Sequence, residues 1–238
     1  MTIARFYLED LADTADCAFL EDEEHRHSRV LRLRRGEEAL ILDGRGTVCR
    51  AVVAEITSSR TRLEILERYR EEEERPRFYL FQSTLPSSRM EEALRRSVEL
   101  GVAAVIPFLS LRSRPMPDTG KLERWRRVAR DASRVAGRAY LPRLEAPLAW
   151  ECLLERINSC PVALLADERG GVRPAEVLGG EEDEIAFIVG PEGGFQGTER
   201  EQLLEAGAVS VTLGKYNLRA ESAGAVILAA ARACYGLL

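Results

Sequence analysis

One stretch, residues 184–225, constrains the fold more than any other part of the chain. It repeats a single pattern in which a short apolar run ends at a glycine-bearing loop and a helical segment follows. The runs Ile185–Val189 and Val209–Leu213 predict strands, and the loops Gly190–Gly194 and Gly214–Arg219 follow them. Strands alternating with helices favour a parallel α/β sheet, whose strands end at one edge. Two glycine loops therefore meet where such sheets bind ligands.

The composition of the first loop limits the ligand. Glycines let backbone groups approach a ligand closely, but the phosphate-binding pattern GxxxxGK[ST] is absent. Glu192 would repel a pyrophosphate and suits a ligand that is cationic or that offers hydroxyls and an amine. Thr198, with Glu201 three residues later, predicts the start of the next helix as a capping box. The spacing alone equally allows an ordinary βα turn whose glycines serve tight packing.

Two motifs taken together are more specific than either alone. GPEGGF with TEREQL, followed by LGKYNLRAESA, resembles the cofactor-binding half of the RsmE-type ribosomal RNA (uracil-N3)-methyltransferases. These enzymes belong to the SPOUT class, which uses S-adenosyl-L-methionine. The resemblance covers nearly the whole chain. It implies an α/β fold with a C-terminal SPOUT trefoil-knot domain and a mostly parallel sheet over residues 71–238. A small PUA-like β-barrel domain over residues 1–70 would precede it and hold RNA.

The N-terminal part predicts a small β-rich domain. Arg5–Leu8 predicts an edge strand, and residues 39–42, 48–56 and 61–66 predict further strands. Asp43–Gly46 has the composition of a turn between the first two of these three. Short strands at this spacing are typical of a small barrel, in agreement with the domain that the resemblance implies.

The charge distribution favours an anionic partner, although the net charge is -5. Residues 89–143 hold 13 Lys and Arg against 6 Asp and Glu, which gives a local balance of +7 between two acidic segments. A basic helical stretch is also predicted at residues 21–33. We expect arginines of both regions to contact RNA phosphates, since a guanidinium binds them in bidentate fashion. These candidates are Arg26, Arg29, Arg32, Arg112, Arg114, Arg134 and Arg138.

Cysteine, histidine and hydropathy patterns exclude several classes. The five cysteines lack CxxC spacing, and the two histidines, His25 and His27, are neighbours near the N-terminus. We therefore expect no zinc or other metal site and no histidine-based catalytic triad in the C-terminal part. No apolar run approaches the length of a membrane span, and the N-terminus lacks a signal-peptide pattern. These features favour a cytoplasmic protein.

The resemblance assigns roles to individual residues. It implies methyl transfer from S-adenosyl-L-methionine to N3 of a uridine in 16S ribosomal RNA of the small ribosomal subunit. From the chemistry of this reaction we choose Arg219, in the second loop, as the candidate that stabilises charge on the base. Glu221 is the candidate general base or, equally, a cap of the last helix. The candidate cofactor-binding residues are Leu165, Ala166, Gly190, Pro191, Glu192, Gly193, Gly194, Leu213, Gly214, Leu218, Arg219 and Ser222. A homodimer through the small-residue helix Ser222–Leu238 is also implied.

The sequence departs from the family's usual pattern at several positions, and other functions stay open. Arg26 stands where the family usually has a histidine, Leu111 where it has an acidic residue, and Arg134-Val135 where it has Glu-Gln. Trp125 and Trp150 fit a core better than a base-stacking role. Two other functions stay open: a related methyltransferase that acts on ribose 2′-hydroxyls, and a non-catalytic RNA-binding or ribosome-assembly module. A nucleotide-dependent oxidoreductase is disfavoured because no GxGxxG motif opens a βαβ unit.

Overall fold

The computed structural model describes residues 3–11 and 15–238. The chain divides into two compact units, and the first is built from two separate pieces of sequence, Met1–Glu73 and Ser133–Leu141. The second contains Glu74–Ala132 and Pro142–Leu238. No local pattern in residues 133–141 indicates that they join the N-terminal unit.

The first unit is a curled five-stranded sheet with one helix. Its strand order is β1-β3-β4-β5-β2, so β1 is an edge strand, as predicted. The β1–β3 pair is parallel, and the other pairs are antiparallel. Two register shifts between β4 and β5 mark irregularities of the kind that bend a sheet. The elements are β1 (Ala4–Tyr7), β2 (Cys17–Leu20), α1 (Asp22–Val30), β3 (Glu38–Leu42), β4 (Thr47–Ile56) and β5 (Thr61–Arg70).

The segment Ser133–Leu141 completes this unit through specific contacts. The Tyr7 hydroxyl donates to the Arg138 carbonyl at 2.6 Å, and Ala139 is buried in one apolar cluster with Tyr7. Arg134 donates from Nη2 to Glu24 Oε1 at 2.6 Å, with side chains only 10% and 8% exposed. A buried charge is stable only when it is paired, so this ion pair fixes the segment in place.

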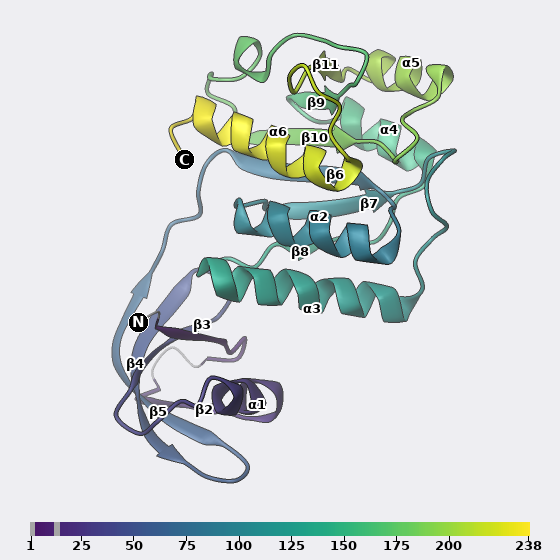
Figure 1. The fold of residues 1–238 in the computed structure, drawn as a ribbon. Coiled ribbons are helices and arrows are strands. Elements are labelled where there is room, and N and C mark those ends of the chain that lie inside the picture. Colours follow the sequence, from purple (N-terminus) through teal and green to yellow (C-terminus); the bar gives the residue numbers. More distant parts are fainter. Residues whose placement is uncertain (1–2, 12–14) are drawn as a thin grey trace. The chain divides into compact units, whose positions relative to one another are not determined.

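The second unit is a six-stranded parallel sheet covered on both faces (Figure 1). Its strand order is β11-β9-β10-β6-β7-β8, and every pair is parallel. Its elements are β6 (Arg77–Ser83), α2 (Ser87–Glu99), β7 (Ala104–Phe108), α3 (Thr119–Ala136), β8 (Arg143–Leu144), α4 (Trp150–Asn158), β9 (Ala163–Ala166), η1 (Pro174–Glu176), β10 (Glu184–Val189), α5 (Gly197–Glu205), β11 (Val209–Val211) and α6 (Ala220–Cys234).

Two cores lie on opposite faces of this sheet because side chains alternate along a strand. Phe78 and Leu80 of β6 pack with residues of α2, α3 and α6, whereas Phe81 packs with residues of α4 and α5. Trp125 is buried in the first core, and Trp150 packs against the second and donates to Gln202. The core interpretation of both tryptophans is confirmed. Burial on both faces explains why the strands appear as continuous apolar runs.

The predicted capping box of α5, Thr198 with Glu201, is wrong. The helix begins at Gly197, and the Gln196 N–H donates to Glu199 Oε2 at 2.9 Å, so Glu199 rather than Glu201 satisfies the helix entrance. Glu199 is buried, and its other oxygen, Oε1, is satisfied by the Leu111 N–H at 2.8 Å. The contact with Leu111 is distant in sequence, so the local pattern around Thr198 could not indicate that Glu199 rather than Glu201 caps the helix.

Candidate active site

A cleft of about 520 Å³ opens at the carboxyl edge of the parallel sheet. Residues 165–169 at and after the end of β9, the loop after β10 and the loop after β11 all line it. The convergence follows from topology, since β9 lies between β10 and β11 and all three run parallel. The two glycine-bearing loops that the sequence singled out thus share one cavity.

Glycine is needed in the first loop for two separate reasons. A Cβ at Gly190 would lie 2.8 Å from the Phe195 ring, which is stacked against Phe108 at a centroid distance of 6.2 Å. Gly194 has φ +66, a conformation that L side chains rarely adopt. The loop therefore folds back on an aromatic anchor and leaves backbone at the surface of the cleft.

The second loop presents exposed side chains. Tyr216 and Leu218 are exposed, and the Arg219 side chain is 78% exposed. Arg219 is the N-cap residue of α6, and its carbonyl accepts from the Ser222 N–H at 2.9 Å. The backbone of Arg219 is thus fixed by the helix, while its guanidinium is available to a ligand.

Two carboxylates and a second arginine complete the centre of the cleft. Glu221, in the first turn of α6, is 4% exposed, and its Oε1 lies 3.9 Å from both Arg89 Nε and Arg219 Nη1. Among the residues that the structure describes, Glu221 Oε2 has no hydrogen-bond partner although it is buried. Arg89 also forms an ion pair with Glu192 of the first loop. Buried polar atoms normally have partners, so Glu221 Oε2 marks a place for a ligand donor.

Asp167 forms a self-contained polar cluster in the cleft wall. Its carboxylate accepts from Arg200 Nε at 2.5 Å, from Ser210 Oγ at 2.9 Å and from the Arg169 N–H at 2.9 Å. Burial alone would raise the pKa of the Asp167 carboxyl, but its three hydrogen-bond donors outweigh burial and hold the pKa below its ordinary value. Asp167 is therefore ionised and fully engaged within the protein.

Comparison with known proteins identifies the family. Residues 72–232 match the family model of an RNA methyltransferase domain, and residues 20–66 match that of an RNA methyltransferase PUA domain. The ribosomal RNA small subunit methyltransferase E of Mycobacterium bovis is 31% identical over 239 residues, which cover 97% of this chain and 91% of that relative. The chain belongs to the ribosomal RNA small subunit methyltransferase E family. It is therefore a methyltransferase.

Other members of the methyltransferase E family support the assignment. The relative from Synechocystis sp. is 33% identical over 213 residues, which cover 86% of this chain and 69% of that relative. The crystal structure of the Neisseria gonorrhoeae enzyme, bound to S-adenosyl methionine, is 31% identical with a TM-score of 0.88 and 98% coverage of both chains. The fold and the domain content predicted from the sequence are confirmed. The trefoil crossing itself stays a prediction.

Most of the candidate cofactor residues lie together in the cleft of this family member. Gly193 and Ser222 are the exceptions, because neither lines the cavity. The Gly193 carbonyl accepts from Arg112 Nη1 at 2.7 Å, and Ser222 Oγ accepts from Arg96 Nη1 at 2.8 Å. The candidates that do line it are Leu165, Ala166, Gly190, Pro191, Glu192, Gly194, Leu213, Gly214, Leu218 and Arg219, together with the candidate base Glu221.

Sequence reasoning missed several residues that line the cleft, chiefly Arg89, Asp167, Phe195 and Arg200. Asp167 directly follows β9, so its place at the end of a predicted strand was a usable signal. Arg89 lies far from both loops in sequence, and no local pattern indicates its contacts with them.

The candidate RNA-binding arginines differ in exposure. Arg26, Arg29 and Arg32 are exposed in the first unit, and Arg112 and Arg114 are exposed in the second. Arg138 is half-buried. Arg134 is buried in its ion pair with Glu24, so its guanidinium is not available to a phosphate and we remove it from the candidate surface.

Within residues 3–11 and 15–238, no group of three or more His, Cys, Asp or Glu side chains is placed to hold a metal ion. In the same part of the chain, no helix combines the length and apolar character needed to cross a membrane.

Proposed function

We propose that the chain transfers a methyl group from S-adenosyl-L-methionine to N3 of a uridine in 16S ribosomal RNA of the small ribosomal subunit. One observation carries the proposal. The exposed guanidinium of Arg219 and the buried, partly unpartnered carboxylate of Glu221 meet in a cleft that two glycine-bearing loops enclose. The family membership and the cofactor bound to the Neisseria gonorrhoeae relative support it.

The cleft suits this cofactor. Exposed loop backbone at Gly190–Gly194 and around Leu213 offers N–H and C=O groups to an adenosyl moiety. The carboxylates of Glu192 and Glu221 suit a ligand that carries a sulfonium cation. Glu221 Oε2 is the orphaned buried atom that such a site would contain for a ligand donor.

The residues of the chain then handle one charge and one proton. When bound, the cofactor supplies an activated methyl group and retains a neutral thioether. Uracil N3–H is a weak acid, so negative charge develops on the imide as its proton leaves. Arg219 would donate to a carbonyl oxygen of the base and stabilise that charge, an effect of roughly 10²–10³ in rate. Glu221, with an oxygen that is buried and without a partner, would accept the N3 proton.

We further propose a homodimer through α6 and a cytoplasmic site of action. Ala225, Val226, Ala229, Ala230 and Ala233 share one side of α6, and none of them is fully buried. Small apolar residues at helical spacing allow a second helix to approach closely. The cysteines in the described part of the chain are all free, which suits a reducing compartment, and the proposed ribosomal substrate is there as well.

The decisive experiment identifies the modified nucleotide. The purified chain is incubated with methyl-labelled cofactor and either 30S subunits or naked 16S RNA, and the RNA is digested and analysed by mass spectrometry. We expect 3-methyluridine. Methyl label on a ribose 2′-oxygen would instead support the related ribose methyltransferase. Saturable RNA binding with neither methylation nor cofactor binding would support a non-catalytic assembly module.

Salt dependence tests the proposed RNA surface. Because exposed arginines displace counterions from phosphates, the affinity for the 16S RNA should fall steeply between 50 and 200 mM salt, by roughly 10-fold or more for only two or three contacts. A filter-binding titration would measure it. An affinity that does not change with salt would contradict phosphate contacts by these arginines.

A further inference from the structure

Arg89 contacts a carboxylate of the first loop and a carboxylate in the first turn of α6, directly after the second loop. It lies in the first turn of α2, where its N–H donates to the Pro86 carbonyl at 2.9 Å. Its guanidinium forms an ion pair with Glu192 of the first loop, and its Nε lies 3.9 Å from Glu221 Oε1 after the second loop. Three elements that are distant in sequence therefore meet at a single side chain.

The backbone position of Arg89 is fixed by the packing of α2, the helix that carries it. Met90, Leu94 and Val98 of α2 are buried in the core that this helix shares with α6, and the two helices lie side by side (Figure 1). The Arg89 side chain remains 41% exposed and lines the cleft. A guanidinium has five donors in a rigid fork, so it is able to hold two carboxylates at once, whereas an ammonium acts as a point charge.

The four charged groups linked by these ion-pair contacts balance one another. Arg89 and Arg219 carry two positive charges, and Glu192 and Glu221 carry two negative ones. Asp167 and Arg200 in the cleft wall neutralise each other. Without Arg89, Glu192 would lose this ion-pair partner and Glu221 would keep only its contact with Arg219 among these four groups. The cleft would then bind a cation more strongly and tolerate a developing anion less well.

We propose that Arg89 is a positioning residue that joins the first loop to the first turn of α6 through Glu192 and Glu221 and neutralises one of these two charges. This inference rests on the proposed function, because it concerns the balance between a sulfonium donor and a uracil anion. Arg89 keeps the cleft from holding the cationic donor too tightly and lets the neighbouring base carry negative charge. It also holds Glu221 where its free oxygen faces the ligand.

The test compares a charged and an uncharged ligand of the same shape. S-adenosyl-L-methionine carries the sulfonium, and S-adenosylhomocysteine carries a neutral sulfur. In Arg89→Met we expect the affinity ratio of the charged to the uncharged ligand to rise about threefold to tenfold over wild type, by Coulomb attraction at partial exposure. We expect kcat on 30S subunits to fall roughly 10- to 100-fold, since charge developing on the base is less well stabilised. Calorimetry and steady-state methylation measure the two effects.

Two further variants separate charge from tethering. Arg89→Lys keeps the charge, so the ligand ratio should stay near wild type while kcat falls, because an ammonium does not reproduce the fork. Arg96→Met is the matched control, since Arg96 also joins α2 to α6 through Ser222 but does not line the cleft. Both its ligand ratio and its kcat should match wild type.

The outcomes are distinguishable. An unchanged ligand ratio in Arg89→Met, or an equal loss of both ligands, would overturn the charge-balancing role and leave Arg89 a structural tether. Full kcat in Arg89→Lys would overturn the bridging role. Failure of the wild-type chain to methylate uridine would refute the proposed function instead, while the ligand ratio would still decide the charge balance.

Discussion

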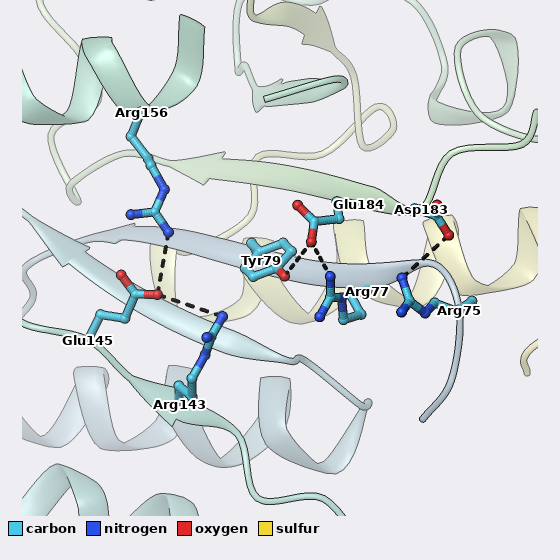
Figure 2. A network of polar contacts seen from close by, with 8 residues as sticks. All are labelled: Arg75, Arg77, Tyr79, Arg143, Glu145, Arg156, Asp183 and Glu184. Atoms are coloured by element: carbon cyan, nitrogen blue, oxygen red, sulfur yellow. Dashed lines mark hydrogen bonds and ion pairs between the residues drawn. The ribbon is translucent and has the colours of Figure 1, made fainter. Parts of the chain in front are cut away.

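The two edges of the parallel sheet carry similar charged residues and use them differently. At the amino edge, Glu184 accepts from Tyr79 at 3.0 Å and pairs with Arg77, its register neighbour on the adjacent strand (Figure 2). Figure 2 also shows Arg75 with Asp183 at 3.4 Å at this edge, and farther along the sheet Glu145 with Arg156 and Arg143 at 3.5 and 4.0 Å. At the carboxyl edge, Arg219 extends into the cleft and Glu221 keeps an unpartnered oxygen.

The difference lies in whether the protein satisfies its own charges. At the amino edge the opposite charges of Arg77 and Glu184 are placed in register, so they stabilise the sheet and leave little for a ligand. At the carboxyl edge Glu221 lies 3.9 Å from both Arg89 and Arg219 rather than in direct hydrogen bonds, which leaves its carboxylate and the Arg219 guanidinium ready for a substrate. Residue type alone therefore does not mark a functional site, whereas incomplete pairing at a strand end does.

The largest expected effect comes from Arg219→Ala at the carboxyl edge. Turnover should fall by about 10²–10³ or more, because the base loses its charge-stabilising donor. Cofactor affinity should stay within about tenfold and stability should be unchanged, since the side chain is 78% exposed. Methylation kinetics, calorimetry and urea unfolding measure the three quantities. A fully active variant would remove Arg219 from the mechanism.

A smaller effect is expected at Asp167, whose carboxylate at the carboxyl edge is fully hydrogen-bonded within the protein. Asp167→Asn should lower the free energy of unfolding by about 2 kcal/mol at pH 7, because a charged hydrogen-bond acceptor is lost. The pKa of this carboxyl is lowered in the folded state, so its contribution is present above the ordinary value of 3.8 and is lost as pH falls through the folded pKa. Urea unfolding at a series of pH values should show the two proteins converging below pH 3.8. A difference that grows in acid would contradict this sign.

At the amino edge the same kind of change should affect stability alone. Glu184→Gln removes the ion pair with Arg77 while keeping the side-chain volume, and both side chains are partly exposed. We expect a loss of about 1 kcal/mol in unfolding free energy and no change in kcat. Chemical denaturation and the methylation assay test this together. A tenfold loss of activity without a loss of stability would break the contrast between the two edges.

The smallest effect is expected at Tyr235, which lies after α6. Its hydroxyl donates to Glu182 and accepts from the Gly179 N–H at 3.2 Å. Burial, together with the bond to Glu182, raises the pKa of Tyr235 to about 12 from 10.0. Tyr235→Phe should lower stability by about 0.5–1 kcal/mol at neutral pH.

The pH dependence of that difference has a definite sign. A raised pKa favours the neutral phenol in the folded state, so the stabilisation is full below pH 10 and declines as pH rises toward about 12. Unfolding of both proteins at pH 8 and pH 11 measures the change. A gap that widens at the higher pH would contradict the assignment.

The sequence predicted the features that local chemistry determines. The apolar runs and the glycine breaks around Ile185–Val189 and Val209–Leu213 correctly placed the strands and the loops that share the cleft. The short strands β2 and β8 escaped notice because two to four residues carry too little hydrophobic periodicity.

Long-range pairing explains what the sequence did not predict. The burial of Arg134 depends on Glu24, and the placement of Arg89 depends on carboxylates more than 100 residues away along the chain. A guanidinium in a basic stretch has the same local pattern whether it is solvated or paired. Only the fold separates the two cases.

The first unit is formed by two separate segments of the chain, and this limits how it could be separated from the rest of the protein. A fragment that ended at Glu73 would deprive Glu24 of the arginine in its ion pair and the Tyr7 hydroxyl of its acceptor. The N-terminal unit therefore cannot be excised or transferred to another protein as one continuous segment. Exchange of this unit between relatives would have to carry residues 133–141 as well.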